Sequence, residues 1–131
     1  MAASAFFDKT YDDALALLVE ARNYIAYQES VDLQALPPQA RLLVSQETMR
    51  VTCRLTESMA WLLAQRAVQV GELSNEDVKA NFAIGGQRVC LDDRWTDDPQ
   101  LPAAVRGLLS RTLSLYERIG RLDDMLRQSA A

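Results

Sequence analysis

The chain has 131 residues, of which 49% are hydrophobic, and its 14 basic and 18 acidic residues give a formal net charge of -4. This length suits one domain, and the scattered basic residues exclude the concentrated positive face that nucleic-acid binding requires. Histidine is absent, which removes the commonest general base and metal ligand and excludes Ser-His and Cys-His nucleophiles.

The first predicted helix spans residues 7–28. Its apolar residues alternate in steps of four and three, which places them on one side of a helix: Phe7, Tyr11, Ala14, Leu18, Ala21 and Ile25. Residues 29–37 have mixed polarity. They end in Leu36 and Pro37, and a second proline, Pro38, follows directly. Because proline pushes the residue before it out of the helical region, we predict a connector over residues 29–37.

The second predicted helix spans residues 38–70 and sets the architecture. Pro38 suits the first helical position, where no N–H is needed, and Gly71 suits the position after a helix end because glycine tolerates positive φ. At 1.5 Å per residue this helix is about 50 Å long. Other long helices must therefore lie along it.

Two neighbouring apolar stripes on this helix predict that it packs against two others. The first stripe consists of Leu42, Met49, Thr52, Thr56, Met59, Leu63 and Val70. The second consists of Val44, Val51, Leu55 and Leu62. We expect Met49 and Met59 to fill the core. The opposite side is expected to face solvent, and its polar residues are Glu47, Arg50, Arg54, Glu57 and Gln65.

Trp61 and Val68 lie in the middle of that polar side. An exposed tryptophan is unusual, so something must cover Trp61. Two alternatives are open: residues 81–91 fold over the ring, or a partner protein buries it. A tryptophan at an interface often carries a large share of the binding energy.

After Gly71, the run from Ser74 to Asp77 has a capping serine followed by acidic residues, which predicts a short helix to about Ala80. Residues 81–100 are predicted to be irregular, with a brief extended piece around Val89 and Leu91. A loop of this length in a compact domain is often functional. The Gly85-Gly86 pair is expected to form a turn, because it lacks the lysine and hydroxyl of a phosphate loop.

Four aspartates lie in this loop, as Asp92-Asp93 and Asp97-Asp98 on either side of Trp95. Clustered carboxylates can hold a divalent cation, but these lack the spacing of a calcium loop and have no phosphate cradle beside them. An acidic, solvated loop is the favoured interpretation, and a hydrolase or a metal-dependent enzyme is the minor alternative. We predict no catalytic residue, no cofactor and no metal ligand.

Cys53 and Cys90 have neither C-x-x-C spacing nor a disulfide-dense pattern, so reduced thiols are expected. The N-terminus lacks the pattern of a signal peptide, and no stretch approaches the roughly 20 apolar residues that span a bilayer. We therefore expect a cytoplasmic protein.

The third predicted helix spans residues 102–127 and carries the strongest periodic signal in the chain. Its apolar positions are Leu101, Val105, Leu108, Thr112, Leu115, Ile119, Leu122 and Leu126. Gly107 and Gly120 either weaken it by about 1 kcal/mol each or permit close approach of another helix. The prediction is an all-α three-helix bundle, one domain over residues 1–131, with a long irregular loop over residues 81–100.

Residues 58–73, with the sequence SMAWLLAQRAVQVGEL, resemble the signature of the regulator-of-CtrA-degradation (RcdA-like) family of alphaproteobacteria. Residues 36–38, 45–55, 101–102 and 115–119 agree, and the resemblance extends over residues 7–126. It implies a three-helix, dimeric, non-enzymatic adaptor that helps to deliver cell-cycle regulators to the ClpXP protease. The best-studied type in that family carries a longer, flexible C-terminal tail, whereas the sequence here stops at Ala131, so tail-dependent tethering to the protease is left open.

We accordingly expect protein partners, namely protease machinery, other adaptors or cargo regulators, together with a second copy of the chain. The predicted interaction residues are Arg54, Glu57, Trp61, Gln65, Arg66, Val68 and Trp95. Nucleic acid and membrane are not expected as partners, and recruitment to a cell pole is left open. The alternative is a structural homodimerisation module without a protease connection, in which Trp61 lies inside the dimer.

Overall fold

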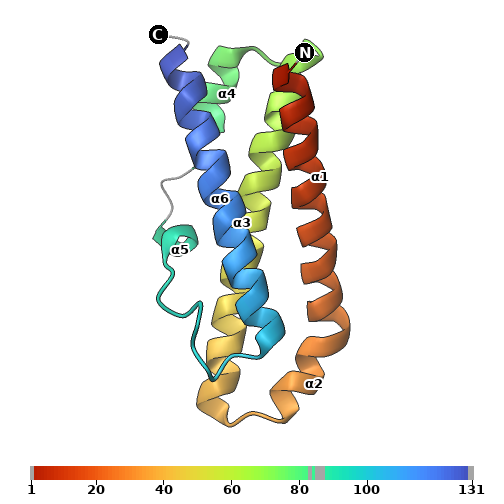
Figure 1. The fold of residues 1–131 in the computed structure, drawn as a ribbon, viewed down its shortest axis with the longest axis vertical. Helices are drawn as coiled ribbons and strands as arrows, with labels where there is room; N and C mark the ends of the chain where they lie inside the picture. The colour runs from red at the N-terminus through yellow and green to blue at the C-terminus, as the bar shows by residue number, and fades with distance from the viewer. Residues whose placement is uncertain (1, 83, 85–87, 130–131) are drawn as a thin grey trace.

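Three long helices run side by side in the computed structural model, which describes residues 2–82, 84 and 88–129 (Figure 1). Every regular element in these residues is helical, which confirms the predicted all-α class. The elements are α1 (Ala2–Asn23), the π-helix η1 (Tyr24–Gln28), α2 (Glu29–Gln34), α3 (Pro38–Gln69), α4 (Asn75–Asn81), α5 (Arg88–Leu91) and α6 (Ala103–Ser129). None of these described helices is both long enough and apolar enough to cross a membrane.

α3 is the central element, with 32 residues. Pro37 has an extended backbone and Pro38 occupies the first turn, so the helix begins where the proline predicted. It ends before Gly71, whose φ of 82° lies in the left-handed region that glycine tolerates. α1 and α6 lie along α3, as its length requires (Figure 1).

The predicted connector over residues 29–37 is wrong for its first six residues, which form α2. η1 carries the chain from α1 into α2 without a break. Asp32 fixes this junction, because its carboxylate accepts hydrogen bonds from the Tyr24 hydroxyl at 2.7 Å and the Gln28 amide at 3.0 Å. The helix stops only at the prolines, where the sequence forbids its continuation.

The core lies between α1, α3 and α6. Its buried residues are Ala14, Ala21, Tyr24, Val44, Val51, Leu55, Trp61, Leu62, Leu101, Val105, Leu108, Leu109, Leu115 and Ile119. They include the whole second stripe of α3 and most of the apolar positions predicted for the last helix. Both of these patterns are therefore confirmed as core faces.

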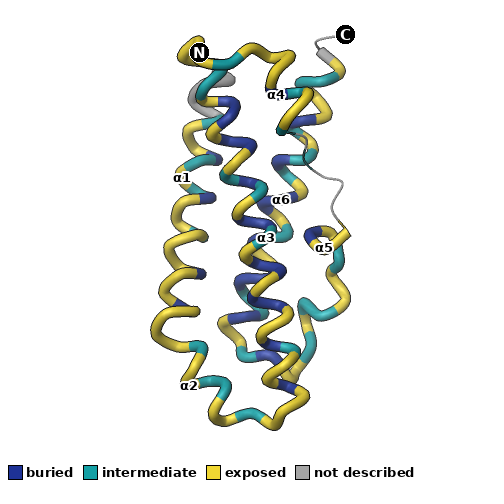
Figure 2. Tube along the Cα trace, turned by 180° about the vertical axis from the view of Figure 1, so that it is seen from behind, coloured by how far each residue is buried: buried dark blue, intermediate teal, exposed yellow. Residues whose placement is uncertain are grey.

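The first stripe of α3 is not in the core, so that prediction is wrong. Leu42 is 72% exposed, Met49 69% and Val70 67%, although Met59 does pack against the core. Exposed positions recur along the whole length of α3 in Figure 2. The side predicted to face solvent is turned inward instead, because α6 and the segment around α5 cover it.

The segment before α6 is more ordered than predicted. Val89 and Leu91 belong to the helix α5, so the predicted extended piece is wrong, whereas Gly85 and Gly86 lie outside the described residues. α4 begins with the predicted cap, a reciprocal pair of hydrogen bonds between Ser74 and Asp77.

The two glycines of α6 do not mark close helix contacts. A Cβ atom added at Gly107 would meet only the Arg111 guanidinium, at 3.6 Å, and one at Gly120 would meet nothing within 4 Å. No described helix of the chain therefore approaches either glycine closely.

Candidate functional site

The residues predicted to bind partners do not form one surface. Arg54, Trp61 and Gln65 are buried, while Glu57, Val68 and Trp95 are only partly exposed. Arg66 is exposed, lies 4.4 Å over the Tyr11 ring and is 3.7 Å from the Asp8 carboxylate. The predicted polar side of α3 is mainly an internal contact surface.

Trp61 is only 1% exposed, and it is covered by α1 and α6. Its ring lies 5.8 Å from that of Phe7, and its Nε1 donates a hydrogen bond to Asp123 Oδ1 at 3.0 Å. Asp123 also accepts from Arg127 Nε at 2.8 Å. Neither of the two covers predicted from the sequence, residues 81–91 or a partner protein, is needed to bury the indole.

Arg54 is fully buried and holds three parts of the chain together. Its guanidinium donates to the carbonyl oxygens of Cys90 at 2.7 Å, Asp92 at 2.9 Å and Leu109 at 2.9 Å. Burial lowers the pKa of Arg54, and neighbouring Arg50 lowers it further. The forked side chain thus joins α3 to α6 and to the end of α5.

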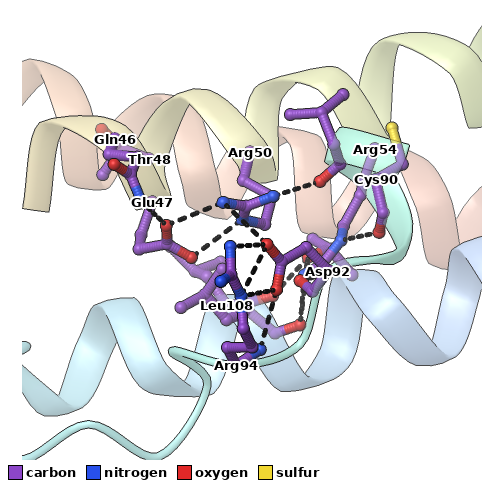
Figure 3. A network of polar contacts seen from close by, with 12 residues as sticks. Gln46, Glu47, Thr48, Arg50, Arg54, Cys90, Asp92, Arg94 and Leu108 are labelled. Atoms are coloured by element: carbon purple, nitrogen blue, oxygen red, sulfur yellow. Dashed lines mark hydrogen bonds and ion pairs between the residues drawn. The ribbon is translucent and has the colours of Figure 1, made fainter. Parts of the chain in front are cut away.

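Arg50 lies one turn before Arg54 and reaches toward the same segment (Figure 3). It donates to the Val89 carbonyl oxygen and pairs with the buried Glu47 carboxylate at 2.9 Å. The last carbonyl groups of a helix have no partner within that helix. Arg50 and Arg54 supply the missing donors for α5, which explains why this short helix is fixed against α3.

Asp92 extends this network outward. Its carboxylate accepts hydrogen bonds from the Arg94 backbone N–H and guanidinium and lies 3.9 Å from Arg50. The hydrogen bonds from Arg94 are the main cause of a pKa well below the usual range for Asp92. Asp98 accepts from the Gln100 N–H at 2.8 Å in the turn that precedes α6. No three metal-binding side chains come together in the part of the chain that the structure describes.

Glu57 and Cys90 meet between α3 and α5. The Cys90 thiol lies 3.1 Å from Glu57 Oε2 and is fully buried, and this burial, together with the carboxylate, raises its pKa to about 12. A cavity of about 230 Å³ borders these groups and is also lined by Cys53. Both cysteines are free thiols.

The two thiols are expected to react at different rates. At pH 8 a thiol reagent such as dithionitrobenzoate should modify the partly exposed Cys53 first, because Cys90 is buried and stays protonated. In urea both cysteines should react together. Single-cysteine variants, Cys53→Ala and Cys90→Ala, assign the rates. Fast modification of Cys90 in the folded chain would contradict the burial described here.

The exposed side of α3 has an unusual composition. Between Arg41 and Arg66 its exposed residues carry no charge at all: Leu42, Ser45, Gln46, Met49, Thr52, Thr56, Ala60 and Leu63. We call this set the α3 face. It is about 30 Å long at 1.5 Å per residue. Surface helices normally place charged residues on the side away from the core, so the α3 face has the composition of a covered surface.

Comparisons with known proteins show a matching family and a similar solved structure. A family described as "Protein of unknown function (DUF1465)" matches residues 1–131. The crystal structure of RcdA from Caulobacter crescentus CB15 is similar to this chain with 32% sequence identity and a TM-score of 0.73, covering 89% of this chain and 87% of that one. No match was found among curated proteins.

Proposed function

The chain belongs to the family described as protein of unknown function (DUF1465), with RcdA as a structural relative, and from this premise we propose that it is a non-enzymatic adaptor. In this role it brings cell-cycle regulators to the ClpXP protease through protein–protein contacts. The observation that carries the proposal is the 32% identity to RcdA over 89% of the chain.

The use of the polar residues supports a binding scaffold. The polar side of α3 is committed to internal bonds: Arg54 to three carbonyl groups, Arg50 to Glu47, and Trp61 to Asp123. These contacts fix the relative positions of α3, α5 and α6. A rigid bundle of this kind presents its outer faces in a constant geometry, which favours recognition of other proteins.

The α3 face supports self-association as part of this role. Leu42, Met49, Thr56 and Leu63 are spaced seven residues apart, and Val70 continues the series. If two copies pair antiparallel about a two-fold axis at Thr56, Met49 meets Leu63 and Leu42 meets Val70 of the second copy. The small residues around the axis allow the two helices to approach closely.

The charges at the ends of the face agree with this antiparallel register. The same two-fold axis places Arg66 opposite Gln46 and Arg41 opposite Gly71, so no like charges meet. A parallel pairing would place each arginine next to the same arginine of the second copy, and the repulsion between these like charges would be unfavourable. In this register Arg66 lies at the edge of the α3 face, where it is available for protein contacts.

Met49→Glu is expected to raise the dimer dissociation constant at least about 100-fold, because each dimer would bury two unpaired carboxylates against Leu63. Sedimentation velocity over a range of concentrations measures the change. Met125→Glu is the matched control, since Met125 is 63% exposed and lies on α6. An unchanged dissociation constant for Met49→Glu, or an equal effect of both substitutions, would argue against the α3 face as the interface.

The adaptor role is tested with purified ClpXP and the regulator CtrA. CtrA is chosen because the RcdA-like family takes its name from the degradation of this regulator. The chain is expected to bind the protease or the regulator and to accelerate ATP-dependent degradation several-fold. Met49→Glu and Met125→Glu, checked for folding, separate a need for the dimer from a need for the chain. If the chain neither binds either protein nor changes the degradation rate, the adaptor proposal fails.

A second candidate function is homodimerisation without any protease connection. The α3 face favours it, because a self-complementary face accounts for a dimer without a third protein. In that case Met49→Glu yields monomers and the degradation assay shows no effect of the wild-type chain. Trp61 cannot lie at the interface of such a dimer, as the sequence suggested, because it is already buried within one chain.

A further inference from the structure

The cavity of about 230 Å³ between α3 and α5 brings together the two cysteines of the chain, although they are far apart in the sequence. Its lining consists of Thr52, Cys53, Thr56, Glu57, Val89 and Cys90. Cys53 is partly exposed, whereas Cys90 is fully buried. One thiol is therefore open to small molecules in the solvent, and the other borders the same cavity from the inner side.

Glu57 shows how near to each other the two thiols lie. Its Oε2 atom is 3.1 Å from the Cys90 sulfur. Cys53 precedes Glu57 by one turn of α3, and the Cβ atoms of residues four apart on a helix are about 5–6 Å from each other. The Cys90 sulfur thus reaches α3 within one turn of Cys53. Arg54 holds α5 in this place, because it donates a hydrogen bond to the Cys90 carbonyl oxygen at 2.7 Å.

The two thiols differ in their access to an oxidant. Burial and the Glu57 carboxylate raise the pKa of Cys90 to about 12, and nearby Cys53 adds to this rise. Because the thiolate is the reactive form of cysteine, Cys90 is protected from direct oxidation at neutral pH. Cys53 is the thiol that a small oxidant meets first. Oxidation of a thiol gives a sulfenic acid, which condenses with a neighbouring thiol to form a disulfide.

We propose that Cys53 and Cys90 form a thiol-oxidation site, at which hydrogen peroxide converts the reduced pair into a disulfide within one chain. The Cys53 sulfur attacks one peroxide oxygen, the O–O bond breaks, and Cys53 becomes a sulfenic acid while one water is released. The Cys90 sulfur then attacks the Cys53 sulfur and displaces its hydroxyl group. Glu57 accepts the proton of the Cys90 thiol, and this proton leaves with the hydroxyl group as a second water. Two thiols and one peroxide give one disulfide and two waters.

This site borders the α3 face, because Thr52 and Thr56 belong to both. A disulfide here fixes α5 covalently to α3. The reaction needs neither a protease nor a second copy of the chain. It therefore goes beyond the adaptor role, and each of the two proposals can fail without the other.

Peptide mapping tests the proposal on the full reduced chain, treated at neutral pH and low protein concentration with one equivalent of hydrogen peroxide. Remaining thiols are blocked with N-ethylmaleimide, and trypsin then releases the cysteines in the peptides of residues 51–54 and 89–94. We expect the mass of these two peptides joined with the loss of two hydrogen atoms, and its disappearance after reduction. Oxidation of Cys53 to a sulfinic acid without the joined peptide, or a bond between cysteines of two chains, would overturn the proposal.

Single-cysteine variants, checked for folding by circular dichroism, separate the two steps. In Cys90→Ala the sulfenic acid at Cys53 has no thiol to react with, so dimedone should capture it. In Cys53→Ala the buried Cys90 should remain a free thiol under the same treatment. Rapid oxidation of Cys90 in Cys53→Ala, or no dimedone adduct in Cys90→Ala, would show that Cys53 is not the thiol that peroxide oxidises first.

Glu57→Gln tests the proton acceptor. This substitution removes the carboxylate that helps to raise the pKa of Cys90, so a purely electrostatic role of Glu57 predicts faster disulfide formation. Loss of the proton acceptor predicts the opposite, and we expect disulfide formation to be at least about tenfold slower. Glu72→Gln is the matched control, since Glu72 is exposed and lies beyond the end of α3. An equal or faster rate in Glu57→Gln would exclude Glu57 from the reaction.

Discussion

Replacing Arg54 with leucine is expected to lower the free energy of unfolding by about 3–5 kcal/mol. The substitution removes the guanidinium that donates to the carbonyl groups of Cys90, Asp92 and Leu109, of which Leu109 keeps a hydrogen bond from the Thr112 hydroxyl. Each carbonyl left without a donor is destabilising. Arg54→Lys should also be strongly destabilising, because one ammonium cannot reproduce the planar fork that reaches three acceptors.

Urea denaturation followed by far-ultraviolet circular dichroism measures this effect. Arg94→Leu is the matched control, since its side chain is 73% exposed and its main partner is the neighbouring Asp92, so a change within about 1 kcal/mol is expected. An Arg54→Leu variant as stable as Arg94→Leu would show that the hydrogen bonds from Arg54 to the α5 segment and α6 do not stabilise the fold.

Trp61→Ala is expected to be destabilising by about 3–5 kcal/mol, the range for removing a large aromatic side chain from a core. The substitution removes the contact with Phe7 and leaves a cavity between α1, α3 and α6. It also removes one of the two hydrogen-bond donors to Asp123. Trp61→Phe keeps most of the packing, so a loss of about 1–3 kcal/mol is expected from the missing Nε1 hydrogen bond.

The same denaturation experiment checks Trp61, with Met125→Ala as an exposed control. If Trp61→Ala were as stable as the wild type and lost only partner binding, the indole would have to be a surface residue. The practical consequence is that Trp61 variants cannot be used to test partner binding, because their effects on folding would be mistaken for effects on an interface.

Much of the fold could be predicted from the sequence because local rules decide it. Pro38 and Gly71 mark the limits of α3, and the spacing of apolar residues from Leu101 to Ile119 identifies the inner side of α6. These signals act within one helix. The prediction of a connector over residues 29–37 was wrong because Asp32 accepts hydrogen bonds from Tyr24 and Gln28 across the junction of η1 and α2. Composition does not reveal such a contact.

The orientation of α3 could not be predicted, for a different reason. Its polar side is buried because Arg50 and Arg54 bind backbone carbonyl groups at Val89, Cys90 and Asp92. Every residue has a carbonyl group, so no residue type marks these acceptors in the sequence. The same limit applies to the α3 face, whose apolar spacing was visible while its exposure was not.

The sequence correctly marked Trp61 as unusual for a polar helix side. The ring is buried there because it makes contacts with residues far away in the sequence. The partners Phe7 and Asp123 lie in α1 and α6, on opposite ends of the chain. An aspartate on the inner side of the last helix was the available signal, since a buried carboxylate requires a donor.

The central claim is that the α3 face pairs antiparallel with that of a second copy, and a charge-swap experiment tests it most directly. Sedimentation equilibrium is measured for Met49→Glu and for Met49→Glu combined with Leu63→Lys. In the antiparallel register each introduced glutamate faces an introduced lysine, so the double variant should recover at least about tenfold of the affinity that Met49→Glu loses. A double variant that stays as monomeric as Met49→Glu, or a wild-type chain that sediments as a monomer at all concentrations, would contradict the account.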